Sequence, residues 1–138
     1  MTSLTTKLGL RPEQTVRLLE GHGEAFDLLT AALPDGVELL YGEGDSPRCD
    51  QLFFWPRSLA GLAERFAALE RCLVPDGSLW VIMPKKAFAA RHNIAFTWEE
   101  MQAAALSTDL VDNKIASISD EEYATRFVIR RERRHLHA

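Results

Sequence analysis

The short separation between two predicted strands constrains this chain more than any other feature. Thr15–Glu20 is typical of an apolar strand that breaks at Glu20–Gly23 into a helix. A second strand, Val37–Tyr41, is followed by only the eight residues Gly42–Cys49 before a third apolar strand, Gln51–Trp55. An extended segment of that length reaches roughly 26 Å, whereas returning along a strand and stepping over two strand spacings needs about 22 Å. The connection has no length for a helix, so we expect a sheet that lacks one βα module and is thinly covered near its second strand.

Helical periodicity is clearest after the third strand. Apolar residues recur at spacings of three and four behind a Ser58 cap, which predicts an amphipathic helix. The apolar positions are Leu59, Leu62, Phe66, Leu69 and Leu73. The turn Pro75–Gly77 ends this helix and leads into Leu79–Met83, which is apolar on both faces like a central parallel strand.

The C-terminal third changes from helical to period-two patterning. Thr97 and Glu100 are spaced as a capping box, which predicts a helix over residues 98–106. Residues 113–119 and 124–131 then alternate apolar and polar side chains on either side of a short acidic turn. This pattern predicts an antiparallel hairpin at the edge of the sheet.

Length and composition favour a single domain, 1–138, with an N-terminal lead-in at 1–14 and a basic tail at 132–138. No stretch has the roughly 18–20 apolar residues of a membrane span, and the N-terminus does not resemble a signal segment. We therefore expect a cytoplasmic protein without a membrane partner. Cys49 and Cys72 form neither a CxxC pair nor a disulfide framework, which predicts reduced thiols. The net charge of −4 disfavours wholesale binding of nucleic acid.

Several segments together carry a resemblance to a known family. They are the strand ending in Glu20–Gly23, the stretch Asp50–Trp55, the run Leu73–Val81 and the final reversed hairpin. Over residues 15–131 the chain resembles a class I S-adenosylmethionine-dependent methyltransferase. This resemblance implies a three-layer Rossmann-like α/β fold, with a parallel core, a C-terminal antiparallel hairpin and one βα module missing. The chain is also similar to a group of small uncharacterised bacterial proteins. The motifs shared with that group are Lys7–Pro12, Pro84–Lys86 and Asp112–Lys114.

The resemblance also indicates where a cofactor would bind, because ligands of such sheets lie beyond the carboxyl ends of the strands. The residues it would use are Glu20, Gly21, His22, Gly23 and Glu43. The missing module, however, would have supplied the wall behind the adenine. Trp55–Arg57 also lacks the acid or amide that amino-methyltransferases place at this point. We therefore expect no catalytic residue and no cofactor, with S-adenosylmethionine as the alternative.

Basic residues predict an anion site at the same rim. Lys85 and Lys86 follow a buried strand, and Lys114 precedes the hairpin that we expect beside it. Three amines converging there would hold a phosphate or carboxylate, and solvated lysines are the alternative. The basic tail is predicted to be a solvated end, with contact to nucleic-acid phosphates as the alternative. His135 and His137 have no zinc-site spacing, so we expect no metal.

Three functions stay open on these observations. The first is a non-catalytic protein with a degenerate methyltransferase-like fold that acts by self-association or partner binding. The thinly covered apolar sheet favours a homo-oligomer, most simply a two-fold dimer. The second is a minimal S-adenosylmethionine-binding methyltransferase. The third is an anion or RNA-backbone binding module that uses the three lysines and the basic tail.

Overall fold

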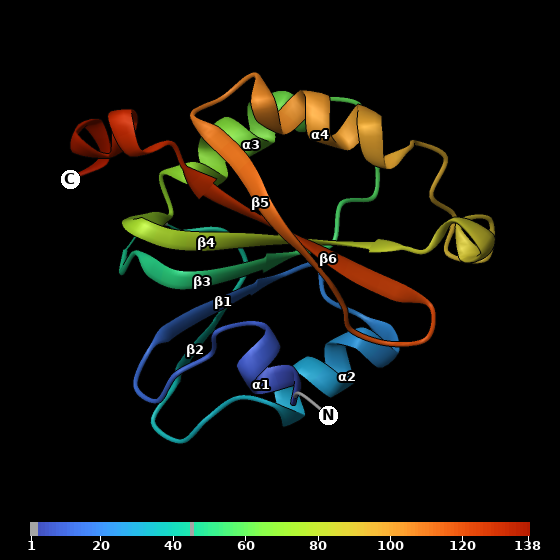
Figure 1. The fold of residues 1–138 in the computed structure, drawn as a ribbon, viewed down its shortest axis with the longest axis horizontal. Coiled ribbons are helices and arrows are strands. Elements are labelled where there is room, and N and C mark those ends of the chain that lie inside the picture. The colour runs from blue at the N-terminus through green and yellow to red at the C-terminus, as the bar shows by residue number, and fades with distance from the viewer. Residues whose placement is uncertain (1–2, 45) are drawn as a thin grey trace.

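The computed structural model describes residues 3–44 and 46–138, and within them the chain forms one mixed sheet. Its strands are β1 (Thr15–Leu19), β2 (Glu38–Tyr41), β3 (Cys49–Phe54), β4 (Leu73–Pro84), β5 (Leu110–Ser117) and β6 (Glu122–Ile129). The strand order is β2-β1-β3-β4-β6-β5 (Figure 1). β2, β1, β3 and β4 pair in parallel, whereas β6 pairs antiparallel with both β4 and β5. This arrangement confirms the predicted parallel core with a C-terminal antiparallel hairpin.

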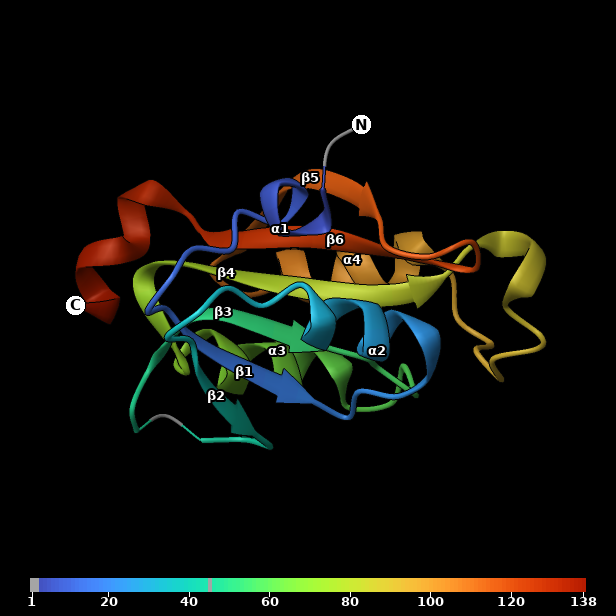
Figure 2. The same cartoon turned by 90° about the horizontal axis from the view of Figure 1, so that it is seen from below.

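Helices cover both faces of the sheet and complete three layers (Figures 1 and 2). They are α1 (Leu4–Lys7), α2 (Gly23–Ala31), α3 (Leu62–Glu70) and α4 (Trp98–Leu106), with the 3₁₀ segments η1 (Lys86–Phe88) and η2 (Arg131–His137). α1 and α2 lie on one face, and α3 and α4 on the other. The predicted capping box at Thr97 and Glu100 is present at the start of α4. None of the helices described is long and apolar enough to cross a membrane.

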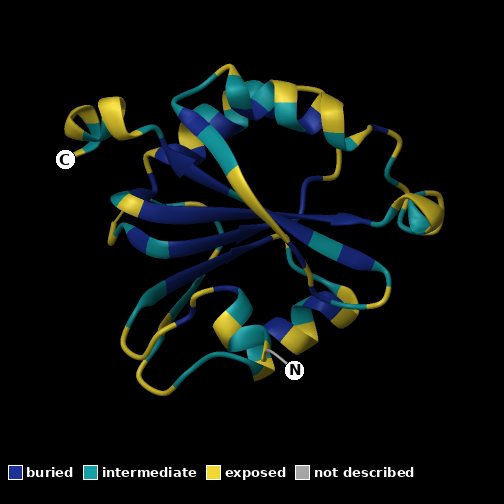
Figure 3. Ribbon diagram, in the orientation of Figure 1, coloured by how far each residue is buried: buried dark blue, intermediate teal, exposed yellow. Residues whose placement is uncertain are grey.

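β3 and β4 are buried on both faces (Figure 3) because their side chains alternate between two cores. Phe53 and Trp80 pack on the side of α1 and α2, where their rings are stacked 6.3 Å apart. Phe54 and Val81 pack on the side of α3 and α4. The two strands therefore have the continuous apolar character expected of central parallel strands.

The connection from β2 to β3 is as short as predicted and has no helix in its described residues, 42–44 and 46–48. It crosses the sheet over β1, where Arg17 Nη1 donates to the Gly42 carbonyl oxygen at 2.8 Å. A Cβ added to Gly44 would lie 3.2 Å from Nη1 of the same guanidinium group. The connection between β2 and β3 thus lies close against the buried Arg17 side chain. The edge strand β2 is only partly covered, and Tyr41 at its end is 63% exposed.

The start of α3 differs from the prediction. The helix begins at Leu62 behind Gly61, not at a Ser58 cap, and Leu59 is exposed. The Ser58 hydroxyl instead accepts from the backbone N–H of Ala60 at 3.2 Å. Gly61 has φ +71°, a left-handed geometry that glycine adopts without steric cost and that breaks the helix before Leu62.

The start of β4 is also earlier than predicted. Leu73 and Pro75–Gly77 belong to the strand, not to the preceding helix and its turn. Gly77 lies against the backbone of β3, because an added Cβ would be 3.1 Å from the Cys49 carbonyl oxygen. The pairing of β3 with β4 shifts register between Cys49 and Gln51, which accommodates this close approach.

The basic tail forms η2 and is hydrogen-bonded to the fold, although most of its residues are exposed, as expected of a solvated end. Arg134 Nε donates to the Ile129 carbonyl oxygen at 2.9 Å. Arg48 donates to the backbone carbonyl of His137. Arg48 is far from the tail in sequence, so periodicity carries no information about this contact.

Candidate functional site

The loop Glu20–Gly23 follows β1 at the carboxyl edge of the parallel strands, where the cofactor pocket was predicted. Gly23 opens α2 with φ +76° and has no atom within 4 Å of an added Cβ. Gly21 is different, because an added Cβ would lie 2.5 Å from the Phe26 ring and 3.1 Å from the Trp55 ring. The two rings meet edge to face with centroids 6.1 Å apart. The side of the loop at Gly21 is therefore filled by aromatic side chains.

The two acids predicted to serve the cofactor are brought together, but around an arginine. Arg65 of α3 contacts Glu20 Oε2 through Nη1 at 3.1 Å and Glu43 Oε1 through Nε at 3.0 Å. Its guanidinium carbon lies 4.9 Å from the centroid of the Phe54 ring. Both carboxylates are thus paired with a cation. Periodicity could not indicate this pairing, because Arg65 lies on the polar face of a predicted helix.

His22 precedes α2 but makes no side-chain capping bond. Its Nδ1 lies 3.0 Å from Arg57 Nη2 and 3.2 Å from the Glu20 carbonyl oxygen. Arg57, from the loop after β3, therefore joins the β1 loop at this edge. The contact links the two segments that the sequence placed at the rim.

A small cavity of about 10 Å³ is lined by His22, Trp55 and Glu122, among others. Such a volume admits about one water molecule and no nucleoside. The indole N–H of Trp55 is buried without a hydrogen-bond partner among residues 3–44 and 46–138. Burial raises the pKa of the Glu122 carboxyl, and the charges of His92 and His22 oppose that shift. Glu122 enters this site from the start of β6, a position the sequence did not single out.

The three lysines predicted to converge occupy separate places. Lys85 Nζ donates to the Ser119 carbonyl oxygen at 3.0 Å. Lys86 lines a cavity of about 380 Å³, whose other walls include Phe96 and Trp98. Lys114 lines a different cavity on the face of α1. The structure therefore does not bring the three amines to one rim, and an anion held by all three has no common site.

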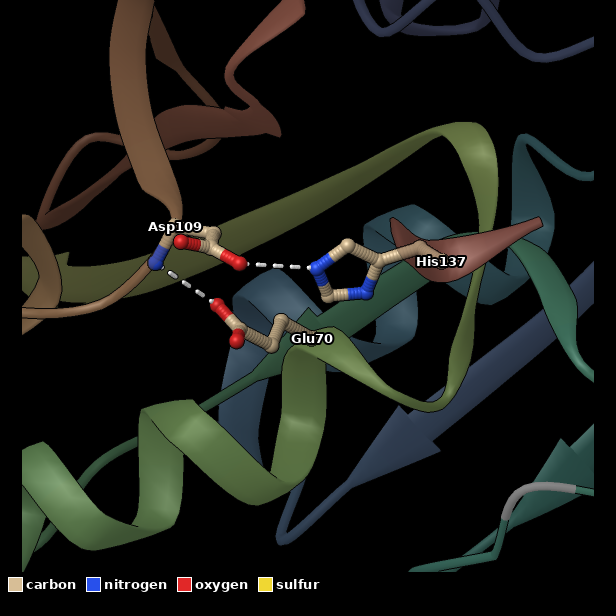
Figure 4. Close-up of side chains that lie close together, drawn as sticks. All are labelled: Glu70, Asp109 and His137. Carbon is tan, nitrogen blue, oxygen red and sulfur yellow. Dashed lines mark hydrogen bonds and ion pairs between the residues drawn. The ribbon is translucent and has the colours of Figure 1, made fainter. Parts of the chain in front are cut away.

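A cluster of Glu70, Asp109 and His137 joins segments that are distant in sequence (Figure 4). His137 Nε2 lies 3.0 Å from Asp109 Oδ2, and Glu70 Oε2 accepts from the Asp109 backbone N–H at 3.0 Å. Arg133 Nε donates to the other Asp109 oxygen at 3.0 Å. The hydrogen bond from His137 lowers the pKa of Asp109, whereas burial raises the pKa of Glu70.

The three ligand atoms of this cluster lie within 4.8 Å of one another, which is close enough for a metal ion. The guanidinium of Arg133 already pairs with Asp109, however, and its charge opposes a cation at that position. The arrangement instead connects η2 to the end of α3 and the start of β5. Sequence spacing could not reveal it, because each residue lies on a different element.

Comparison with known proteins gives the same architecture. No protein-family model and no curated protein matches the sequence. A SAM-dependent methyltransferase from Aquifex aeolicus matches with a TM-score of 0.63 at 12% identity, covering 91% of this chain and 87% of that one. A putative type 11 methyltransferase from Sulfolobus solfataricus matches with a TM-score of 0.55 at 12% identity, covering 83% of each chain. This chain has a class I methyltransferase fold.

A third similar structure was solved with bound ligands. It is the geranyl diphosphate C-methyltransferase from Streptomyces coelicolor, solved with Mg²⁺, geranyl diphosphate and S-adenosyl-L-homocysteine. Its TM-score is 0.60 at 13% identity, and the match covers 91% of this chain and 78% of that one. At such identity the likeness establishes the fold alone.

Proposed function

We propose that this protein uses a methyltransferase fold for binding, not for catalysis, and acts by self-association or through a partner. The observation that carries the proposal is the packing at the carboxyl edge of β1 and β3. The rings of Phe26 and Trp55 fill the space beside Gly21, and the cavity next to them measures about 10 Å³. A methyl donor bound there would have to displace the buried Trp55 ring and the partly buried Phe26 ring.

The electrostatics of this edge support the same proposal. Glu20 and Glu43 each commit one carboxylate oxygen to Arg65, so a ribose would have to compete with that guanidinium for these acids. The connection between β2 and β3 also leaves no helix in its described residues to stand behind an adenine. An active methyltransferase would need each of these features changed.

The edge strands supply the surface for self-association. β2 and β5 end the sheet on its two sides, and an edge strand offers unpaired backbone groups to another chain. Tyr41 on β2 and Ile115 on β5 are 63% and 58% exposed. We propose a homodimer formed through one of these edges. Cys49 and Cys72 are both buried and form no disulfide in the described part of the chain, which suits the reducing conditions of a cytoplasmic location that belongs to the same proposal.

Titration with S-adenosylhomocysteine, followed by thermal unfolding and calorimetry, tests this proposal. We expect no saturable heat and no rise in melting temperature at millimolar ligand, together with a dimer mass in light scattering. The matched variant is Gly23→Leu. Gly23 has φ +76°, so a leucine there would disturb the loop and with it any ligand bound at the loop. Saturable binding by the wild type that Gly23→Leu abolishes would overturn the non-catalytic proposal, and a monomeric mass would overturn the dimer.

A further inference from the structure

The largest polar cavity described lies at the opposite end of the parallel strands. It has a volume of about 430 Å³ and opens between α1 with the loop after it, the starts of β3 and β4, and the hairpin β5–β6. Ligand pockets commonly measure about 300–1,000 Å³, so a small metabolite fits this volume. The cavity is separate from the methyltransferase-like rim, so its role does not depend on whether a methyl donor binds there.

Four cations line this cavity, and none of them forms an ion pair with a carboxylate among the residues described. They are Lys7, Arg11, Lys114 and Arg126. By contrast, Arg65, Arg91 and Arg133 each pair with an acid elsewhere on the molecule. The chain as a whole carries a net charge of −4, so this concentration of unneutralised positive charge runs against its overall balance.

The four cations are held by neutral acceptors or left free. Lys114 Nζ donates to the Lys7 carbonyl oxygen at 2.6 Å, and Lys7 Nζ donates to the Ser117 carbonyl oxygen at 3.1 Å. Arg126 Nε donates to Ser78 Oγ at 2.8 Å, which leaves its terminal nitrogens available to a ligand. Each of these bonds positions the cation without cancelling its charge.

Two acids also line the cavity, and they leave a positive excess. Asp50 accepts the backbone N–H of Thr15 through Oδ2 at 2.8 Å, which commits one carboxylate oxygen to the start of β1. Asp76 is exposed near the start of β4. Four cations against two acids leave a local charge of about +2, a balance that attracts anions.

The floor of the cavity contains a series of hydrogen bonds made by buried polar side chains. Trp80 Nε1 donates to Gln51 Oε1 at 3.1 Å, and Gln51 Nε2 donates to the Gly9 carbonyl oxygen at 3.2 Å. Trp80 and Gln51 are 1% and 5% exposed. These bonds hold the backbone of the loop after α1 against the sheet at Gly9, between Lys7 and Arg11 in the chain.

We propose that this cavity is a binding site for a small phosphate-bearing metabolite. Guanidinium groups of Arg11 and Arg126 match the geometry of phosphate oxygens, and the ammonium groups of Lys7 and Lys114 add charge. A single cavity of about 430 Å³ favours a small molecule over an RNA backbone, which needs a continuous basic groove.

Calorimetric titration with pyrophosphate, inorganic phosphate and a single-stranded oligouridylate tests this site in the full chain. We expect saturable binding of pyrophosphate, weaker binding of phosphate, and affinity that falls as salt concentration rises. Arg11→Met is the first variant, because Arg11 is exposed and its side chain makes no hydrogen bond among the described residues. It should weaken pyrophosphate binding by roughly tenfold, the order of one charge-assisted contact.

Lys114→Met is the second variant and should weaken binding to a similar degree, and Lys86→Met is the control because Lys86 is exposed in a different cavity. Circular dichroism and melting temperature confirm that each variant is folded. The absence of saturable pyrophosphate binding would overturn the proposal, as would an equal loss in Lys86→Met. Tighter binding of the oligouridylate than of pyrophosphate would also overturn it and would assign the surface to RNA.

Discussion

At the carboxyl edge of the parallel strands, Arg65 bridges Glu20 and Glu43, and the cavity beside Trp55 holds about 10 Å³. At the amino edge, on the face of α1, four cations surround about 430 Å³ without a carboxylate partner among the described residues. The same fold thus fills the carboxyl edge beside β1 and β3, leaves a cavity of about 380 Å³ beyond the end of β4, and gathers cations at the amino edge. Aromatic packing fills the carboxyl edge beside Gly21, whereas cations without carboxylate partners among the described residues mark the amino edge.

The two buried tryptophans allow the largest test of this comparison. Trp55 and Trp80 are each 1% exposed, but Trp80 donates to Gln51 whereas Trp55 Nε1 is unpaired in the described part of the chain. Substitution by Phe shrinks both rings equally. Trp80→Phe also leaves the buried Gln51 oxygen without a donor, so we expect it to lower the free energy of unfolding by about 1–3 kcal/mol more than Trp55→Phe does.

Urea unfolding of the two variants measures the difference. Trp80→Phe should also weaken pyrophosphate binding, since Gln51 fixes the loop after α1 through Gly9. Equal destabilisation by the two substitutions would show that the polar floor of the amino edge adds nothing to stability.

Arg65→Met tests the carboxyl edge and should have a moderate effect on the free energy of unfolding. The side chains of Glu20 and Glu43 are 39% and 52% exposed, so loss of both ion pairs should cost about 0.5–1 kcal/mol, and less at high salt. Because Phe26 and Trp55 still fill the loop, S-adenosylhomocysteine should not bind to this variant. Thermal unfolding with and without the ligand measures both effects.

The control for Arg65→Met is Arg71→Met, an exposed arginine that follows the same helix. It should leave stability unchanged within error. Ligand binding gained by Arg65→Met alone would mean that the arginine, and not the aromatic packing, closes the edge.

The sequence predicted local elements well because their causes are local. The capping box at Thr97 and the alternation along β5 and β6 each lie within a few residues, and α4 and the hairpin formed as expected. The short connection after Tyr41 likewise predicted the absence of a helix from a length argument. Errors arose where a glycine geometry decided the outcome, as at Gly61 before α3.

The candidate site was harder to predict because its charges pair across the fold. Arg65 is one turn into α3, yet it neutralises two acids from loops 22 and 45 residues earlier in the chain. Lys114 was expected beside Lys86, but it faces α1, because its strand position pairs with Arg126 and not with the end of β4. Periodicity predicts the face of an element, and only the assembled sheet determines which charges meet.

The smallest expected effect concerns the amino edge on the opposite face, where Glu70 and Asp109 hold η2. Burial raises the pKa of Glu70 above its ordinary 4.5, so the folded chain binds this proton more tightly than the unfolded chain does. The resulting stability is present below pH 4.5 and is lost as the pH rises through the folded-state pKa. Glu70→Gln keeps an acceptor for the Asp109 N–H without the charge, so it should be more stable than wild type at pH 7 and equal to it at pH 4. Urea unfolding at both pH values measures this, with exposed Glu132→Gln as the control that should show no such dependence. A Glu70→Gln variant that is less stable at pH 7 would mean that the buried carboxylate, through its attraction to His137, stabilises the tail more than its desolvation costs.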